Sequence, residues 1–313
     1  MNLQLQKIFR LLIITLFTTG LIQAQENNAI IGKWDIHVIK GDQILPSWLE
    51  VKLSGIKALV GSFVGESGSA RPISEVFYHD GTVDFSIPPQ WDGNNDMHFS
   101  AILEDDKLIG TILSSEGTAM SFTGERAPKL LRKGEVKWAK PRPLFDGETL
   151  DQWKPLSSDY KNQWVAKDGQ LVSPQSGVNI ITNEEFTDFK LHIETRYPAE
   201  SNSGIYLRGR YEVQIEDSYG KDPSSILFGG IYGFLTPNEI AANKAGEWQV
   251  FDITLLGRRV TIVANGKTVI SDQIIPGITG GASDSNEGNP GPLMLQGDHG
   301  TVAFRNITIQ TPK

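Results

Sequence analysis

Short runs of β-branched and aromatic residues, separated by turn signals, fill the chain from about residue 27 to its end. Glycine recurs between the runs beside Asp, Asn and Ser, the residues that tight turns favour. No segment repeats apolar residues every 3.6 positions over the length of an ordinary helix. Short strands joined by frequent turns are typical of sheets built from hairpins, so the pattern predicts an all-β protein.

The first group of strands, within residues 27–128, predicts a small barrel. Its strand-like runs are Lys33–Ile39, Trp48–Leu53, Leu59–Val64, Glu75–Tyr78, Thr82–Ile87, Met97–Leu103 and Lys107–Leu113. Up-and-down strands at this spacing close into a barrel, which leaves no sheet edge. Gly32-Lys33-Trp34 resembles the opening of lipocalin barrels, in which the tryptophan covers one end. We expect an accessory domain; the alternative is a barrel that binds a small molecule inside.

Residues 129–143 separate this barrel from a second group of strands. The segment concentrates Lys and Arg and carries Pro141 and Pro143, which predicts a solvated linker. Residues 144–313 contain many more short strand-like runs. Two large packed sheets are the usual arrangement for so many strands, so we predict a jelly-roll sandwich.

The N-terminus has the features of a signal peptide. Lys7 and Arg10 precede the apolar run 11–21, and Ala24 supplies a small residue at a cleavage point. The alternative, a membrane anchor, takes about 20 apolar residues, and this run is shorter. We therefore predict that residues 1–24 are removed and that the mature protein is periplasmic or secreted.

Composition restricts the partners. The formal charge of −8 becomes −10 if Lys7 and Arg10 leave with the signal peptide, which has no acidic residue. A chain this acidic is a poor partner for nucleic acid or an anionic membrane, and a neutral sugar fits better. The chain has no cysteine, so its core alone must stabilise the fold after export.

Alternation sorts three strands into an apolar and a polar face. The polar sides of the strands 189–196, 203–208 and 210–216 together carry Glu194, Tyr206, Arg208, Glu212 and Gln214. Gly209 joins the last two strands as a hairpin, and we expect all three strands to be neighbours. Paired carboxylates beside Arg and Tyr can bind a polyol and move protons. The alternative is the wet side of an ordinary antiparallel sheet.

His299 lies in the glycine-rich turn 296–300, which follows a predicted strand. A histidine there acts as an acid, a base or a metal ligand, or it caps the turn, and the sequence leaves these open. The chain has no P-loop, dinucleotide-binding glycine motif, GxSxG, HExxH or cysteine metal site. The acidic run 284–288 lacks the spacing of an EF-hand, so we interpret it as a flexible loop.

An ordered series of motifs within residues 144–311 resembles the 3-keto-disaccharide hydrolase family. The series comprises Leu144–Trp153, Trp164–Leu171, Asp188–Glu194, Asn202–Arg208, Tyr211–Ile215, Gly246–Gln249, Asn265-Gly266, Leu295–Gly300 and Phe304–Ile307. Each motif is short, and it is their order that makes the set specific. The family is similar in fold to the concanavalin A-like lectins and glucanases, which implies the same sandwich here.

The resemblance implies cleavage of glycosides whose glucose unit is oxidised at C3. The ketone acidifies the C2 proton, so a base can remove it, the C1 substituent leaves, and water adds. The implied roles are Glu212 or Glu194 as the base, Arg208 as the enolate stabiliser, and Tyr206 or His299 as the acid. The implied substrate-binding residues are Gln214, Gln296 and Asn202. A divalent metal in place of Arg208 stays open, and no other cofactor is expected.

Two other functions stay open at this point. A lectin-like module would bind sugar without turnover, and a conventional glycoside hydrolase would cleave an unoxidised sugar. Binding modules more often present Trp or Tyr platforms, whereas the predicted face carries carboxylates and an arginine. We therefore predict an enzyme.

Overall fold

A computed structural model of the chain describes residues 29–91, 93–132 and 134–313. The predicted signal peptide, residues 1–24, lies outside the described residues. Within the described ranges, no helix has the length and apolar character needed to cross a membrane. The chain divides into two compact units: one ends at Phe63 and resumes over Arg71–Arg126, and the other comprises Val64–Ala70 and Ala127–Lys313.

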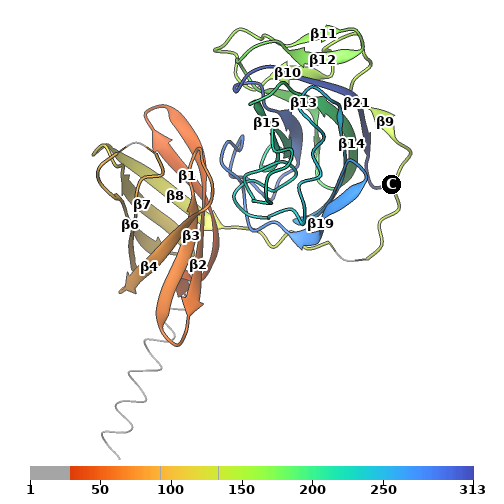
Figure 1. Ribbon diagram of the computed structural model, residues 1–313. Helices are drawn as coiled ribbons and strands as arrows, with labels where there is room; N and C mark the ends of the chain where they lie inside the picture. The colour runs from red at the N-terminus through yellow and green to blue at the C-terminus, as the bar shows by residue number, and fades with distance from the viewer. Residues whose placement is uncertain (1–28, 92, 133) are drawn as a thin grey trace, which may run out of the picture. The chain divides into compact units, whose positions relative to one another are not determined.

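The first unit is a closed barrel, drawn in orange to olive in Figure 1. Its strands are β1 (Gly32–Lys40), β2 (Gln43–Ser54), β3 (Ala58–Val64), β4 (Arg71–His79), β5 (Thr82–Ile87), β6 (Met97–Glu104), β7 (Lys107–Leu113) and β8 (Ala119–Arg126). Each strand neighbours the next in sequence, and β8 returns to β1, which confirms the predicted closed barrel. The sequence analysis missed β8, because Phe122 is its one large buried apolar residue.

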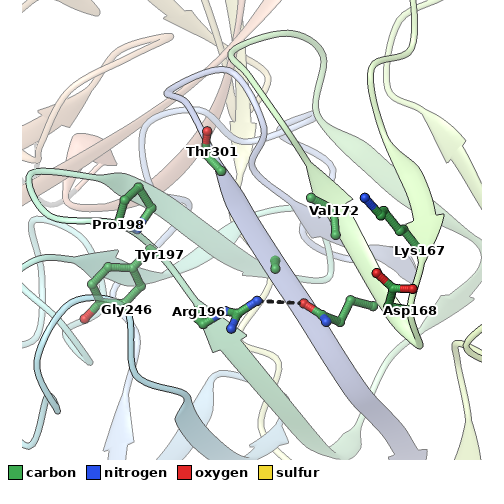
Figure 2. Close-up of a pocket in the computed structure, with 10 residues that line it drawn as sticks. Lys167, Asp168, Val172, Arg196, Tyr197, Pro198, Gly246 and Thr301 are labelled. Atoms are coloured by element: carbon green, nitrogen blue, oxygen red, sulfur yellow. Dashed lines mark hydrogen bonds between the residues drawn. The ribbon is translucent and has the colours of Figure 1, made fainter.

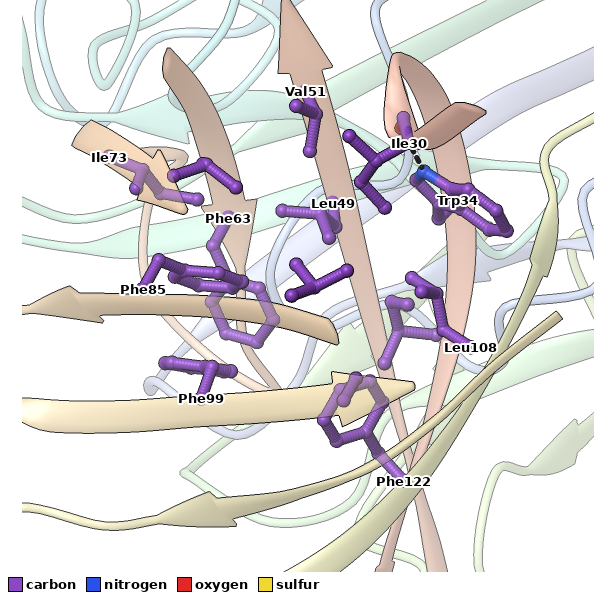
Figure 3. Packing of buried hydrophobic residues seen from close by; sticks show 14 of the residues in the cluster. Ile30, Trp34, Leu49, Val51, Phe63, Ile73, Phe85, Phe99, Leu108 and Phe122 are labelled. Atoms are coloured by element: carbon purple, nitrogen blue, oxygen red, sulfur yellow. Dashed lines mark hydrogen bonds between the residues drawn. The ribbon is translucent and has the colours of Figure 1, made fainter. Parts of the chain in front are cut away.

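Alternation fills the barrel with side chains. In β5 every second residue is buried, and Phe85 stacks on Phe99 with ring centroids 4.4 Å apart. Figure 3 shows aliphatic side chains packed around this pair. Trp34 is fully buried, donates its indole N–H to the Ile30 carbonyl at 3.1 Å and lies under the Arg126 guanidinium. The barrel interior is therefore a packed hydrophobic core.

The second unit contains two sheets. The five-stranded sheet has the order β10-β13-β20-β15-β16, and the eight-stranded sheet has the order β11-β12-β21-β14-β17-β18-β19 with β9 paired to β21. The first is built from β10 (Trp153–Pro155), β13 (Ile180–Phe186), β15 (Asn202–Leu207), β16 (Tyr211–Glu216) and β20 (Gly291–Leu295). The second is built from β9 (Arg142–Pro143), β11 (Val165–Lys167), β12 (Gln170–Ser173), β14 (Phe189–Arg196), β17 (Gln249–Leu256), β18 (Arg259–Ala264), β19 (Lys267–Ile274) and β21 (Val302–Gln310).

Apolar residues at alternate positions are buried in both sheets, and in β15, β16 and β20 nearly every residue of either face is buried. In β14, Leu191 and Ile193 are fully or almost fully buried, and in β16 the same holds for Val213 and Ile215. Period-two burial of apolar residues is what two packed sheets require. The all-β prediction is confirmed for both units.

The described residues of the basic segment 129–143 are exposed or partly exposed, and several of them also make specific contacts with the second unit. Arg132 forms an ion pair with the buried Asp188, and the Ala139 amide donates to the Thr311 carbonyl at 2.9 Å. β9 then adds a short edge to β21. The segment contacts the second unit because its backbone and two arginines, Arg132 and Arg142, find specific partners there. Its basic composition alone could not show those partners.

Candidate functional site

The hairpin of β15 and β16 carries the candidate site. Its register pairs Tyr206 with Glu212 and Gly204 with Gln214, and cross-strand partners in an antiparallel pair share a face. These four residues therefore lie on the face opposite the apolar residues of the hairpin. The predicted pairing of the two strands, and the shared face of Tyr206, Glu212 and Gln214, are confirmed.

Gln296 extends this face across a third strand. β20 pairs with β15 through Leu295 and Ile205, and the Gln296 amide donates to the Gly204 carbonyl at 3.0 Å. Gly204 on β15 therefore lies between Gln296, which follows β20, and Gln214 on β16, and the three residues share one face. A Cβ atom placed on Gly204 would lie 2.4 Å from Glu212 Oε1, so the glycine leaves the space that this carboxyl group occupies.

The Glu212 carboxyl is buried and has no cationic side chain paired with it in the described structure. Only 4% of the residue is exposed. Burial, with a smaller contribution from the charge of Asp298, raises the pKa of Glu212 to about 8, although a hydrogen bond with Tyr206 acts in the opposite direction. A carboxylic acid with such a pKa can hold and release a proton near neutral pH, which suits a general acid or base.

Tyr206 is buried beside Glu212. Its hydroxyl donates to the Gly280 carbonyl at 3.1 Å. Burial and then the nearby Glu212 charge raise the pKa of Tyr206 well above its ordinary value, so the phenol stays protonated. A Cβ atom on Gly281 would lie 2.3 Å from the phenol oxygen. The absence of a side chain on Gly281 therefore allows its backbone to approach the hydroxyl closely.

Asp298 and His299 form a more exposed pair next to these groups. His299 Nδ1 and Asp298 Oδ1 are 2.5 Å apart, and about half of each side chain is exposed. The hydrogen bond to Asp298 raises the pKa of His299, which favours the protonated imidazolium. The charge of Asp298 also raises the pKa values of Glu212 and Tyr206, so this carboxylate lies within electrostatic range of the buried acid.

The turn that carries this pair is fixed by contacts with Gly297. Its amide donates to Asn179 Oδ1 at 2.8 Å, and its carbonyl accepts from Gln163 Nε2 at 3.2 Å. A Cβ on Gly297 would lie 2.8 Å from the Trp164 ring. The motif that begins at Trp164 thus supports the turn that places Asp298 and His299.

Two side-chain oxygens on this face have no hydrogen-bond partner. Gln214 Oε1 and Gln296 Oε1 are both buried and unpaired, while Gln214 Nε2 donates to the Ile226 carbonyl at 3.3 Å. An unpaired buried acceptor costs about 1–3 kcal/mol, so each of these oxygens is available to a donor such as water or a ligand hydroxyl. The two amide oxygens are suited to accept from sugar hydroxyls. Asn202, a predicted substrate-binding residue, is partly exposed opposite Glu216, farther along the same hairpin.

Glu194 does not share this face, so the prediction that placed it there is wrong. It lies on β14, which belongs to the eight-stranded sheet. Its carboxylate accepts from Arg305 Nε and Asn306 Nδ2, both at 2.7 Å. Burial alone would raise the pKa of Glu194, but these two hydrogen bonds hold it below its ordinary value. Alternation orders residues within a strand and does not show which strands are neighbours.

Arg208 does not share it either. The residue follows the end of β15, where its φ of 56° turns the chain, so the strand alternation no longer applies. Its guanidinium donates to the carbonyls of Glu287 and Asn289, and it lies 5.9 Å from the Tyr211 ring. Tyr211 is on the face opposite its neighbour Glu212. The Arg208 side chain therefore holds the loop before β20 instead of facing the carboxyl group.

The acidic run 284–288, interpreted from sequence as a flexible loop, is part of the same buried network. Asp284 accepts from Arg210 Nε at 2.7 Å. Glu287 is fully buried, accepts from the Tyr211 hydroxyl at 2.7 Å and forms an ion pair with Arg258. Among the described residues, no three His, Asp or Glu side chains converge as metal ligands do.

The sequence analysis missed three contributors to the site. Asp298 precedes His299 in a quoted motif, and its proximity to Glu212 could not be inferred from that position. Gly204 stood in another motif as an ordinary strand residue. Tyr232 comes from the irregular segment after β16; burial and the charge of Glu212 raise its pKa. No local pattern marks Tyr232, because a long loop brings it to the site.

Comparison with known proteins identifies the second unit. A family model described as "3-keto-alpha-glucoside-1,2-lyase-like domain" matches residues 140–310. The chain belongs to this family. The matched residues include the whole hairpin and the turn that carries His299. The resemblance found in the sequence is confirmed. No protein with a curated description matches the chain.

Several solved structures are similar to about half of this family member. Two candidate glycosyl hydrolases from Parabacteroides distasonis ATCC 8503 are 31% and 25% identical in sequence, with TM-scores of 0.45 and 0.44. The matches cover 54% and 55% of this chain, and 82% and 100% of the two relatives. The carbohydrate-binding module CBM66 from Bacillus subtilis is 13% identical, with a TM-score of 0.37, over 51% of this chain and 96% of the module.

Proposed function

We propose that this chain is an exported enzyme that cleaves 3-keto-glycosides by elimination followed by hydration. The observation that carries the proposal is the buried Glu212 carboxyl, whose pKa of about 8 suits proton transfer, between two unpaired amide oxygens. Membership of a family described as 3-keto-alpha-glucoside-1,2-lyase-like supports the substrate class.

Glu212 acts first as the base. In its ionised form it takes the C2 proton of the 3-keto sugar, and the electrons of the C–H bond form the C2–C3 double bond of an enolate. A carboxylate held in a buried site is a stronger base than one in water, because its pKa is raised. The side-chain oxygens of Gln214 and Gln296 accept hydrogen bonds from sugar hydroxyls, and these bonds hold C2 over the carboxylate.

Tyr206 and His299 handle the charges that develop. The Tyr206 hydroxyl donates to the enolate oxygen on C3, in exchange for its present partner, the Gly280 carbonyl. The enolate electrons then expel the C1 oxygen, and the imidazolium of His299 protonates that oxygen as it leaves. Water next adds its hydroxyl to C1 and gives its other proton to the neutral His299, while the protonated Glu212 returns a proton to C2. The balance is one water consumed for each glycosidic bond cleaved.

One observation favours a second candidate, conventional hydrolysis of an unoxidised sugar. Asp298 and Glu212 are two carboxyl groups close enough to affect each other, and one has a raised pKa. Glycoside hydrolases use such a pair, with the high-pKa member as the acid. A lectin-like binding protein is the third possibility from sequence, and no specific contact favours it over the other two.

The deciding experiment compares two chromogenic substrates, p-nitrophenyl glucoside and its 3-keto derivative, each as the α and the β anomer. We expect p-nitrophenol from the ketone alone, and deuterium at C2 of the sugar product when the reaction runs in D2O. Release from the parent glucoside at a similar rate would establish the conventional hydrolase. Binding of either compound without release would establish a binding protein. Repeating the assay with EDTA tests whether a metal takes part.

Export is part of the proposal and rests on residues 1–24 alone. N-terminal sequencing of protein recovered from the periplasm or the medium tests it. A mature chain that begins at Gln25 supports cleavage after Ala24, whereas an intact Met1 contradicts it.

A further inference from the structure

A pocket of about 460 Å³ lies on the eight-stranded sheet, apart from the hairpin that carries Glu212. Figure 2 shows the side chains around it. The pocket is lined by the β11–β12 hairpin, the end of β14 with the two residues after it, the start of β21, and one residue of the segment before β17. The lining residues are Lys167, Asp168, Gln170, Val172, Arg196, Tyr197, Pro198, Gly246, Thr301 and Ala303. A pocket of this size fits a ligand of one or two sugar units.

The floor of the pocket is a row across three neighbouring strands. Val172 pairs with Ala303, and Ala303 pairs with Arg196, so the three side chains point to the same side of the sheet. That side is the outer one, because the adjacent Leu171 and Phe304 are fully buried in the core. The small Ala303 between two larger side chains creates the hollow.

The polar walls are held in place. Asp168 and Gly169 form the two-residue turn between β11 and β12, with φ of 54° and 73°, the conformation that favours an Asp-Gly pair in a tight hairpin. Arg196 Nη2 donates to Gln170 Oε1 at 3.0 Å, and the Arg196 guanidinium lies 4.7 Å from the centroid of the Trp248 ring. These contacts fix Arg196 before any ligand arrives.

The hydrogen-bond donors and acceptors that line the pocket indicate which kind of ligand it binds. Lys167 and Arg196 donate hydrogen bonds, Asp168 accepts them, and Thr301 does both. A sugar needs both kinds of partner, because each hydroxyl donates and accepts. An anion would be attracted by the two cations but repelled by Asp168. We propose that this pocket is an accessory binding site for a neutral sugar unit, independent of the reaction at Glu212.

Binding is tested by NMR titration of the full chain with methyl glucoside and, separately, with potassium phosphate. The Glu212→Gln variant is the background, so that turnover does not interfere. We expect saturable amide shifts at Lys167, Asp168 and Thr301 with methyl glucoside and none with phosphate. Absence of shifts with the sugar up to 100 millimolar, or shifts with phosphate alone, would overturn the proposal.

Variants identify which pocket is responsible. Ala303→Leu fills the hollow, and Lys167→Met removes a donor, so each should weaken the sugar affinity at least tenfold. Lys190→Met is the matched control, because Lys190 is exposed on the same strand as Arg196 but does not line the pocket. Turnover of a small 3-keto substrate should be unchanged when each of the three substitutions is made alone in the chain that retains Glu212. If affinity persists in both pocket variants, the site is wrong, whatever the outcome of the activity assay.

Discussion

Two glutamates on two sheets of the same unit show how differently one residue type can be used. Glu194, on β14, is bonded by Arg305 and Asn306, and its pKa is held below the ordinary value. Glu212, on β16, is more deeply buried and has no cationic partner among the described residues; its pKa is raised. Both lie on the polar side of an alternating strand, so the sequence pattern does not distinguish the two carboxyl groups.

The difference separates a structural carboxylate from a reactive one. Glu194 stabilises its sheet because its charge is compensated. Glu212 costs stability when ionised, and proteins retain such groups mainly where chemistry needs them. The space left by Gly204 and the two unpaired amide oxygens support the same assignment.

The largest expected effect is on catalysis. Glu212→Gln removes the proton-transfer group, and we expect turnover of a 3-keto-glucoside to fall about 10³-fold, in the range of general acid–base catalysis. Glu194→Gln should change turnover less than about threefold, because its carboxylate lies on the other sheet. Steady-state kinetics with both variants measures the contrast.

A control must show that the variants fold. Circular dichroism and the affinity for the proposed accessory sugar site should match the wild type in both. If Glu212→Gln and Glu194→Gln both keep full rates, neither carboxylate is the base. If Glu194→Gln alone abolishes turnover, Glu194 is the base and Glu212 is not.

The sequence predicted the parts of this site that depend on local spacing. Period-two alternation placed Tyr206, Glu212 and Gln214 on one face, and Gly209 marked the connection between their strands. It could not place Glu194, since alternation carries no information about strand neighbours. β14 and β15 are consecutive in the chain, yet they belong to different sheets.

Long loops limited the prediction in a second way. Arg208 was expected on the polar face, but the residues that bond it, Glu287 and Asn289, are about 80 positions later. The acidic run 284–288 was interpreted as a flexible loop because its cationic partners are far away in sequence: Arg210 lies 74 positions before Asp284, and Arg258 lies 29 positions before Glu287. Contacts of this kind follow from packing, and neither composition nor spacing reveals them.

The second effect concerns stability and tests the reassignment of Arg208. Arg208→Met leaves two buried carbonyls without their donor, and we expect the free energy of unfolding to fall by about 3 kcal/mol. Arg259→Met is the matched control: its ion pair with Asp272 is exposed, so the change should stay within about 0.5 kcal/mol. Urea unfolding measures both. If the Arg208→Met protein is as stable as the wild type but inactive, Arg208 takes part in the reaction and its reassignment is wrong.

The smallest effect is the pH dependence of stability, where the two glutamates should have opposite signs. The folded-state pKa of Glu212, about 8, is above the ordinary value of 4.5, so the folded state binds more protons between these pH values. Its contribution is therefore fully present below pH 4.5 and is lost as the pH rises through 8. Between pH 6 and 8 the wild type should lose about 2 kcal/mol relative to Glu212→Gln.

Glu194 has the reverse dependence, because its folded-state pKa is lowered. Its stabilising contribution is present above pH 4.5 and is lost as the pH falls through the folded-state value. The difference in unfolding free energy between the wild type and Glu194→Gln should thus stay constant from pH 6 to 8 and shrink toward pH 3. Urea unfolding at pH 3, 6 and 8 measures both variants.

Parallel curves of unfolding free energy against pH for the wild type and Glu212→Gln, from pH 6 to 8, would show that Glu212 is not an uncompensated buried acid. The physical argument for Glu212 as the base would then fail.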